Sequence, residues 1–400
     1  MKKIHFMLLL GSFSLVIAGC DLDNSDAEKD ENVEDSEGFV GDLETEGEPE
    51  EASDHTVSFY AVGDNLIHKQ IIDYAEKEDG SYDFKPIYEN LTSDIEEADL
   101  AYINQESIIG GDDLDFTGYP AFNTPSDMVE NLVDLDFDIV NASNNHALDR
   151  GSEGVQNTLA YWEDYKDEVL FTGVFNSQED RDEIPVLEVD DIDFSVLSYT
   201  YGTNGIEPDN PYEINYFDRD LITQDVEYAQ EESDFLIVSA HWGDEHEFAP
   251  NQMQKDYAQL FADLGVDLVV GNHSHTIQPI EWVEGEDGHE TLVIYSLGNF
   301  VASTTEDFNL LGGSVAMDFV EDSEEEISID NVHFEPHVIH YEEGVEGDIE
   351  SRTNFELFKL EDYTDDLAKK HALYDFEDND ISLDYYEGLV DEVIDKEFLE

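Results

Sequence analysis

The sequence predicts an α/β fold, and three observations support this prediction. From residue 56 onward, apolar β-rich runs alternate with amphipathic stretches of helical pattern, which is typical of an α/β core. From about residue 277 onward most runs have the strand pattern, so we expect a second sheet packed on the first. With 400 residues, 40% of them hydrophobic, the chain can bury a large core.

The expected strands and helices follow each other closely along the chain. Strands are expected over residues 57–62, 100–103, 137–140, 184–200 (two strands joined at 190–191), 235–240 and 266–270. Helices are expected between them over residues 86–98, 126–135, 154–164, 222–232 and 252–264. Further strands are expected over 277–283, 291–295, 313–319 and 327–340, followed by an amphipathic helical tail over about 353–400.

The first twenty residues have the pattern of a lipoprotein signal peptide. Lys2 and Lys3 give a positive start, and residues 4–18 form a mostly apolar stretch, shorter than the roughly 20 residues of a membrane span. Small residues stand directly before Cys20, as in bacterial lipoboxes, where the cysteine is lipidated. A plain signal peptide with an incidental cysteine is the alternative. Cys20 is the single cysteine of the chain, which favours lipidation and excludes an intramolecular disulfide.

Residues 21–55 form an acidic run that is nearly free of aromatic side chains and has no periodicity. This composition predicts a disordered tether between the lipid and a folded domain, in preference to a metal-binding segment. The expected organisation is therefore a signal peptide (1–20), a tether (21–55), a folded domain (56–345) and a C-terminal helical extension (346–400).

The charge of the chain is strongly acidic, with 102 Asp and Glu against 16 Lys and Arg and a formal net charge of −86. Such a surface excludes nucleic acid as a partner, because nucleic-acid binding needs a basic footprint. The acidity indicates either a halophilic surface adapted to a salty medium or a site for cations or a cationic partner. The excess runs through the whole chain, and this distribution favours the halophilic surface.

Polar clusters directly follow five of the expected strands. The carboxyl ends of strands in an open α/β sheet form the ligand crevice, so these side chains can converge although they lie far apart in sequence. Carboxylate, amide and imidazole ligands suit Mn, Fe or Zn, and thiolate zinc sites in the domain are excluded. The side chains in these clusters are Asp64, Glu106, Asn145, His146, His241, His273 and His275.

Taken singly, each of these residues has a simpler explanation. An Asp or Glu after a strand is often a helix cap or part of a turn, and a single His is more often a hydrogen-bonding group than a ligand. The pair His273 and His275 is more specific, because alternate residues at a strand end point the same way. Five clusters after five strands favour a metal site over five unrelated turns.

Six motifs in the order found here resemble the CapA family of capsule (poly-γ-glutamate) biosynthesis proteins, which is itself similar to the calcineurin-like metallophosphoesterases. The resemblance covers about residues 56–340 and implies a four-layer α/β/β/α sandwich with a dinuclear site of divalent metal ions (Mn, Fe or Zn) at one end. The motifs are AVGDNLIH, AYINQES, FDIVNASNNHALDRG, VSAHWGDEHEFAPNQMQ, DLVVGNHSHTIQPIE and YSLGNFV.

The resemblance also implies roles for the individual residues. The first metal would be held by Asp64 and His275, with Glu106 as the bridging ligand. The second metal would be held by Asn145, His241 and His273.

Two further residues would act beside the metals rather than on them. His146 would stand next to the substrate phosphate as a general acid or electrostatic stabiliser. Asp149 would orient His146 or its loop by a hydrogen bond.

The chain departs from the family pattern at two places. It has Asn272 and Ser274 around His273, where the family usually reads Gly-His-His-Pro-His. The wider phosphoesterases carry Asp-x-His in the first motif, whereas Leu66 stands two residues after Asp64 here. His68 is the nearest substitute for the missing histidine.

Three functions remain open from the sequence. The first is a metal-dependent hydrolase or transferase on the outer face of the cell membrane, acting on a phosphoester or a γ-glutamyl polymer. The second is a non-catalytic extracellular partner of a membrane polyglutamate synthase that assists polymer assembly or export. A solute-binding lipoprotein is the third, although it would not need so many polar clusters. The lost first-motif histidine favours the partner, and the retained His146 favours the enzyme.

Overall fold

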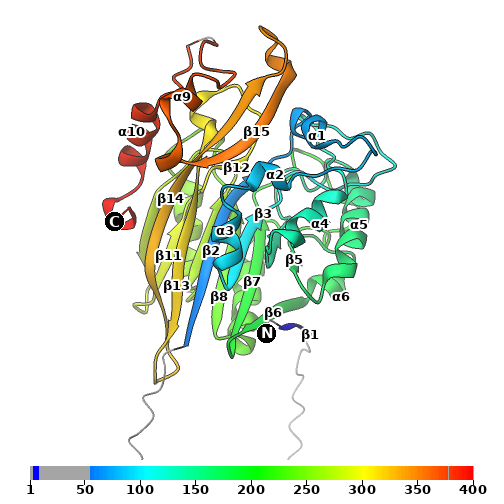
Figure 1. Ribbon diagram of the computed structural model, residues 1–400. Helices are drawn as coiled ribbons and strands as arrows, with labels where there is room; N and C mark the ends of the chain where they lie inside the picture. The colour runs from blue at the N-terminus through cyan, green and yellow to red at the C-terminus, as the bar shows by residue number, and fades with distance from the viewer. Residues whose placement is uncertain (1–2, 9–54, 377, 400) are drawn as a thin grey trace, which may run out of the picture.

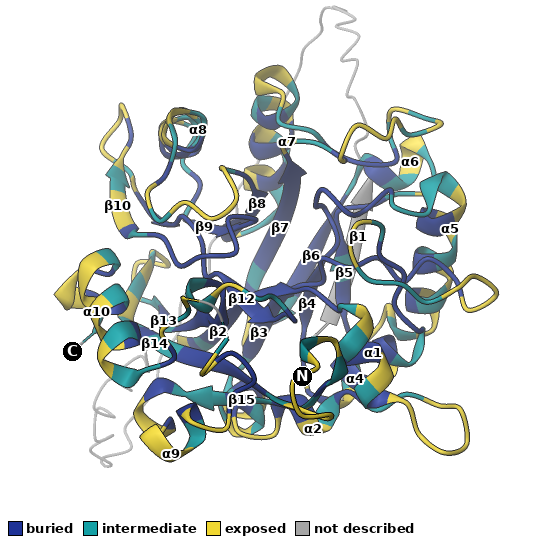
Figure 2. Ribbon diagram, turned by 90° about the horizontal axis from the view of Figure 1, so that it is seen from above, coloured by how far each residue is buried: buried dark blue, intermediate teal, exposed yellow. Residues whose placement is uncertain are grey.

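The computed structural model describes residues 3–8, 55–376 and 378–399, and it confirms the predicted α/β fold. Two β-sheets pack face to face, and helices cover their outer faces (Figure 1). Seen from above, α7 and α8 lie outside one sheet, while α1, α2 and α4 lie outside the other (Figure 2). This is the four-layer α/β/β/α arrangement expected from the sequence.

The first sheet has seven strands, in the order β1-β6-β7-β8-β9-β11-β10. Strands β7, β8, β9 and β11 run parallel to one another. Their bounds are β1 Lys3–Leu8, β6 Glu183–Val189, β7 Ile192–Thr200, β8 Phe235–His241, β9 Leu268–Asn272, β10 Ile280–Glu284 and β11 Glu290–Ile294.

The second sheet has the order β15-β14-β13-β2-β3-β4-β5, and the short β12 pairs with the end of β2. Strands β2 to β5 are parallel, so their carboxyl ends reach the same edge. Their bounds are β2 His55–Asn65, β3 Leu100–Asn104, β4 Ile139–Asn141, β5 Leu170–Thr172, β12 Asn299–Val301, β13 Leu311–Glu321, β14 Ile327–Glu343 and β15 Arg352–Lys359.

The helices connect the strands on the outside of the molecule. Several begin at a side chain that caps the first free backbone N–H groups, such as Asp218 before α7 and Asn251 before α8. Their bounds are α1 Lys69–Ala75, α2 Lys85–Tyr88, α3 Thr92–Glu97, α4 Asp127–Asp134, α5 Gly151–Trp162, α6 Gln178–Arg181, α7 Arg219–Glu232, α8 Gln252–Asp263, α9 Asp365–Ala368 and α10 Leu383–Val393.

Aromatic side chains join the two sheets across the core. Phe319 of β13 lies 4.4 Å from Phe235 of β8 and 5.5 Å from Phe194 of β7, measured between ring centroids. Phe59 of β2 packs on the same Phe319 ring at 5.3 Å. All four rings are at most 2% exposed, and burying such rings is among the largest favourable contributions to folding. The sheets are therefore fixed against each other, and so are the loops at their ends.

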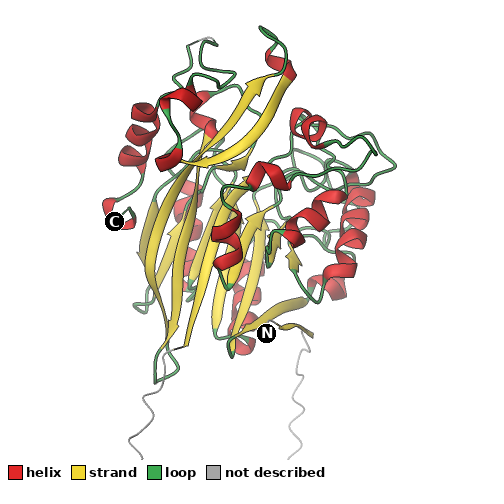
Figure 3. Cartoon of the chain, viewed as in Figure 1, coloured by secondary structure: helices red, strands yellow, loops and turns green. Residues whose placement is uncertain are grey.

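The C-terminal extension differs from the expectation. Residues 353–400 were expected to be helical throughout, but Arg352–Lys359 forms strand β15 and pairs antiparallel with β14 (Figure 3). Phe355 and Leu357 of this strand are fully buried. Their alternation with more exposed neighbours is a strand pattern, which the helical interpretation overlooked. The helical part is limited to α9, α10 and short 3₁₀ turns.

Two further differences concern short elements. The helix expected over 86–98 is divided into α2 and α3, because the chain turns at Leu91, whose N–H donates to the Tyr88 carbonyl oxygen. Within the expected signal peptide, Lys3–Leu8 pairs antiparallel with β6, while Cys20 and the expected tether up to residue 54 lie outside the described residues. In the described part of the chain, no helix has the length and apolar character needed to cross a membrane.

Candidate metal centre

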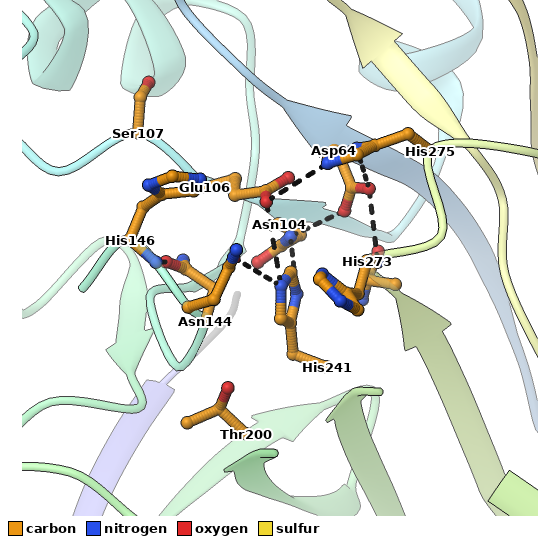
Figure 4. Close-up of polar contacts among 12 residues, drawn as sticks. Asp64, Asn104, Glu106, Ser107, Asn144, His146, Thr200, His241, His273 and His275 are labelled. Atoms are coloured by element: carbon orange, nitrogen blue, oxygen red, sulfur yellow. Dashed lines mark hydrogen bonds and ion pairs between the residues drawn. The ribbon is translucent and has the colours of Figure 1, made fainter. Parts of the chain in front are cut away.

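The side chains predicted to bind metal lie together at the carboxyl ends of the parallel strands. Five of them can be seen in Figure 4, namely Asp64, Glu106, His241, His273 and His275. The sixth is Asn145, whose Oδ1 lies 2.9 Å from Nε2 of His241. Each sheet contributes three of them, because both sets of parallel strands end at the same side of the molecule. All are buried, with at most 7% of any residue exposed. The second sheet supplies Asp64, Glu106 and Asn145, and the first supplies His241, His273 and His275.

Glu106 occupies the middle of this group and has an unusual environment. Neither carboxylate oxygen has a hydrogen-bond partner among the described residues, although both are buried. One oxygen, Oε1, lies 3.7 Å from Nε2 of His241 and 3.7 Å from Nε2 of His275. Burial, followed by the nearby charge of Asp64, raises the pKa of Glu106 well above its usual value. A buried carboxylate with free lone pairs is costly unless a cation or proton satisfies it, so this position fits a metal ligand.

Three of the residues form a compact group that fits a metal ion. One ligand atom each from Glu106, His273 and His275 lies within 4.8 Å of the others. Nδ1 of His273 is buried and, within the described structure, has no hydrogen-bond partner. Burial lowers the pKa of His241 and His273 well below the usual value, so both imidazoles are neutral. Neutral imidazole is the form that binds metal.

Asp64 lies beside this group, at the end of β2. Its Oδ1 accepts a hydrogen bond of 2.7 Å from Nδ2 of Asn104, and its Oδ2 lies 3.1 Å from Nδ1 of His275. Burial alone would lower the pKa of His275, but the charge of Glu106 and the hydrogen bond to Asp64 outweigh it and raise the pKa to about 10. The carboxylates therefore favour a positive charge at this place in the site, which a divalent cation bound to neutral His275 would supply.

Asn145 and His241 meet on the other side of Glu106. The amide Oδ1 of Asn145 lies 2.9 Å from Nε2 of His241, so both ligand atoms face the same point. The amide nitrogen of Asn145 points away, toward Oδ1 of Asn204 at 3.4 Å. The amide oxygen is thus directed into the site, as a metal ligand would be.

His146 borders the site without belonging to the compact group. Its Nδ1 lies 2.8 Å from Oδ2 of Asp149, and its ring packs edge-on against Phe122, with centroids 4.6 Å apart. The residue is 5% exposed. The structure therefore brings His146 and Asp149 together, as expected from their spacing in the sequence.

His68 does not replace the missing first-motif histidine in the contacts that the structure shows. Its Nδ1 lies 3.0 Å from the Leu66 carbonyl oxygen and 3.2 Å from the Ser303 nitrogen, and its ring packs against Phe122. Leu66 itself is buried and apolar. The first motif thus supplies Asp64 alone to the group of ligands.

Sequence reasoning missed two residues of the site. The Tyr201 ring packs on His273 with centroids 4.4 Å apart, and 41% of the residue is exposed. Oδ1 of Asn299 lies 3.0 Å from Nδ1 of His275. Tyr201 directly follows β7, so the rule that strand ends gather at the site could have found it. The only sequence feature that could have indicated Asn299 was its position in the YSLGNF motif.

Comparison with known proteins places most of the domain in one family. Residues 58–304 match the family described as "Bacterial capsule synthesis protein PGA_cap". The chain is 29% identical over 188 residues to "PGA biosynthesis protein CapA" of Bacillus subtilis (strain 168). The aligned segment covers 44% of this chain and 46% of that protein. It is 24% identical over 179 residues to "Capsule biosynthesis protein CapA" of Bacillus anthracis, covering 43% and 42%. The chain thus matches less than half the length of these curated relatives.

Two solved structures are similar at low sequence identity. One is the NAD nucleotidase of Haemophilus influenzae, with a TM-score of 0.47 and 12% identity, covering 84% of this chain and 59% of that one. The other is a putative 5'-nucleotidase of Staphylococcus aureus, with a TM-score of 0.43 and 12% identity, covering 70% and 54%.

Proposed function

Because the chain belongs to the bacterial capsule synthesis protein family PGA_cap, we propose that it acts in poly-γ-glutamate capsule biosynthesis as a metal-dependent hydrolase. The observation that most directly supports a metal-dependent activity is the environment of the Glu106 carboxylate. Its two buried carboxylate oxygens lack hydrogen-bond partners in the described structure and face His241 and His275. A buried carboxylate without hydrogen-bond partners needs a nearby proton or cation, and a pair of metal ions would meet this need.

The proposed site would hold two divalent cations, Mn, Fe or Zn. Asp64 and His275 would be ligands of the first, Asn145, His241 and His273 would be ligands of the second, and Glu106 would serve both. Such cations stabilise negative charge on a phosphoryl group and activate water. Mixed oxygen and nitrogen donors of this kind suit these three metals, and the site contains no thiolate.

The chain's own proton donor in this proposal is His146. The Asp149 carboxylate accepts the Nδ1 proton of His146 and fixes the ring, which leaves Nε2 to transfer a proton to or from the substrate. Phe122 packs against one edge of the ring and limits its rotation. We propose that substrate reaches the site past Tyr201, because this residue is 41% exposed whereas Phe122 is fully buried.

We further propose that the protein works on the outer face of the cell membrane, held there by a lipid on Cys20. The positive start, the apolar stretch and the small residues before Cys20 support this location. A membrane polyglutamate synthase is the expected partner, because the curated relatives are named for capsule or PGA biosynthesis.

The second candidate is a non-catalytic partner of such a synthase. It is favoured by Leu66, which is buried and apolar at the place where phosphoesterases carry a first-motif histidine. With Asp64 and His275 as its remaining ligands besides Glu106, the first metal would be held weakly. In this candidate the domain would assist polymer assembly or export without hydrolysis.

Elemental analysis of the purified full chain, followed by a panel of phosphoesters with Mn, Zn and Fe, tests the proposal. Bound metal with hydrolysis that disappears in His146→Asn would support the enzyme. Bound metal without hydrolysis of any substrate would favour the partner. Absence of bound metal at saturating concentration would contradict both the metal site and the hydrolase.

A further inference from the structure

The YSLGNF motif, at residues 295–300, supplies none of the proposed metal ligands. Its end forms the short strand β12, which pairs in parallel with the end of β2 so that Asn299 stands opposite Asp64. The N–H of Asp64 also donates to the carbonyl oxygen of Gly298 at 2.9 Å. The motif therefore lies directly against the first expected metal ligand.

The amide of Asn299 is fixed in one orientation. Its Nδ2 donates to the Asn309 carbonyl oxygen at 3.0 Å, so its Oδ1 must face the other way, toward Nδ1 of His275 at 3.0 Å. The backbone oxygen of Asn299 lies 3.0 Å from Nε2 of the buried His337. Asn299 and Asn309 are at most 2% exposed, so water does not compete for these bonds.

The backbone around Asn299 leaves no room for it to shift. A Cβ atom on Gly312 would lie 2.0 Å from the Asn299 oxygen, and one on Gly63 would lie 2.0 Å from the Gly298 oxygen. Gly298 itself has a φ of 69°, which side-chain-bearing residues rarely adopt. Close backbone packing thus fixes the position of Asn299 as well as its hydrogen bonds.

These contacts determine which nitrogen of His275 carries the proton. Oδ1 of Asn299 and Oδ2 of Asp64 both accept, and both face Nδ1, so the hydrogen belongs on Nδ1. Nε2, 3.7 Å from Oε1 of Glu106, is then the nitrogen with a free lone pair. Asp64 alone would not fix the orientation of the His275 ring. It also accepts hydrogen bonds from Asn104 and from the His273 backbone N–H, and it is itself a proposed metal ligand.

We propose that Asn299 is a positioning residue that holds His275 with its proton on Nδ1 and presents Nε2 to the metal beside Glu106. This inference rests on the proposed metal site. It gives the YSLGNF motif a function: the glycine allows the close approach, and the asparagine orients the ligand. Mutation of a residue that hydrogen-bonds a metal-ligating histidine typically lowers metal affinity by about 10–100-fold.

The test compares Asn299→Leu, which removes the acceptor at similar size, with Asn299→Asp, which keeps it. Zn²⁺ affinity is measured on the full chain by competition with a chelator, and the tautomer of His275 by ¹⁵N NMR of the zinc-loaded protein. Asn299→Leu should bind Zn²⁺ about 10–100-fold more weakly and lose the uniform Nδ1–H signal. Asn299→Asp loses the hydrogen bond to the Asn309 carbonyl oxygen but keeps an acceptor for Nδ1 of His275, so it should retain Nδ1–H and bind Zn²⁺ more tightly than Asn299→Leu.

Asn131→Leu is the matched control for lost stability. Asn131 is also buried, accepts one hydrogen bond from the Phe84 N–H and donates one to the Asp127 carbonyl oxygen, but it lies on α4. This variant should be destabilised without a change in Zn²⁺ affinity. A folded Asn299→Leu protein with wild-type affinity would overturn the inference and leave the metal site intact. A wild-type chain that binds no Zn²⁺, Mn²⁺ or Fe²⁺ would instead overturn the proposed function, and the inference with it.

Discussion

Oδ2 of Asp149 lies 2.8 Å from Nδ1 of His146, and the same oxygen accepts the backbone N–H of Phe122 at 2.7 Å. One carboxylate therefore sets the orientation of the histidine and the position of the loop whose phenyl ring packs against it. Asp149 is buried to the same degree as its partner, since their side chains are 2% and 6% exposed. The pair is well placed to direct Nε2 of His146 at a substrate.

His146→Asn should separate catalysis from metal binding. The variant should keep its metal content and its fold, because His146 is outside the proposed ligands. It should lose about 10²–10⁴-fold in the hydrolysis rate of an activated phosphoester, which is the usual contribution of a general acid or base. Steady-state kinetics together with elemental analysis checks both statements. Full capsule production by His146→Asn cells, alongside a loss in His273→Ala cells, would indicate a structural metal instead.

Asp149→Asn should act through His146. The amide oxygen can still accept from Nδ1, but the negative charge is lost and the amide NH2 group can face the ring instead, so the ring loses its single fixed orientation. We expect a decrease in kcat of roughly 10–100-fold with little change in KM. The double variant with His146→Asn should be no slower than His146→Asn alone. Additive losses in the double variant would show that the two residues act independently.

His273→Ala should lower metal content and thermal stability together. His273 belongs to the compact group with Glu106 and His275, and a metal bound only by the native state stabilises that state, by about 2.7 kcal/mol at 100 times the Kd. Melting curves with and without chelator measure this effect. The control is His289→Ala, a partly exposed histidine that contacts the Val266 carbonyl oxygen away from the site. Equal metal content in both variants would contradict the ligand role.

Stability should increase with salt. A formal net charge of −86 produces self-repulsion in the compact state, and salt screens it. The melting temperature should rise substantially between about 0.1 M and about 2 M NaCl, where the Debye length falls to a few Å. Sodium sulfate at equal ionic strength helps to distinguish screening from ion-specific effects. A flat curve would mean that the acidity does not act on the folded domain.

The mature N-terminus should be a lipidated Cys20. Mass spectrometry of the protein from the membranes of its native producer should find the N-terminal peptide beginning at Cys20 with acyl chains attached. Cys20→Ser should leave the protein unlipidated and release it from the membrane fraction. An unmodified N-terminus away from residue 20 would contradict the anchor.

Acid should destabilise the packing of the C-terminal segment through His340 and His371. Their rings meet edge to face with centroids 5.3 Å apart, and burial lowers the pKa of His340 to about 4 and of His371 to about 3. The unfolded chain takes up these protons near pH 6.5, so it binds more protons than the folded state below that pH. The free energy of unfolding should therefore fall as pH decreases from about 6.5 toward 4.

His371→Phe isolates this contribution from the many carboxylates of the chain. A phenyl ring can keep the packing on Tyr341, whose ring centroid lies 4.4 Å from that of His371, but it cannot take up a proton. Denaturant unfolding at pH 7 and pH 5 should show a smaller pH effect in the variant than in the wild type. An identical pH effect would show that His371 is not titrated in this range.

The sequence predicted the parts of the fold that depend on local pattern. Apolar runs such as 235–240 form central strands, because strands covered on both sides are apolar throughout. Residues 353–359 were misassigned, because the short strand-like alternation around Phe355 and Leu357 was overlooked beside the helical pattern of the residues that follow. Strand β5 was missed because three residues are too few to show a period.

The site was predictable where its residues follow strands. The rule that strand ends converge located His241 and His273 from the sequence pattern alone. It could not locate Asn299, whose contact with His275 depends on β12 returning to the end of β2. It also could not show that His68 turns toward the backbone of Leu66 and Ser303, because that orientation is set by neighbours distant in sequence.

The central position of β2 has a consequence for how the chain folds as it is synthesised. β2 pairs with β3, which follows soon after it, and with β13, so that the Tyr60 hydroxyl donates to that of Ser314 across 254 residues. Until β13 has emerged, one edge of β2 has no partner from its own sheet. Such a late, long-range pairing slows folding and leaves a strand edge open to other chains. We therefore expect newly synthesised copies to pass through a period in which the open edge of β2 can pair with other chains.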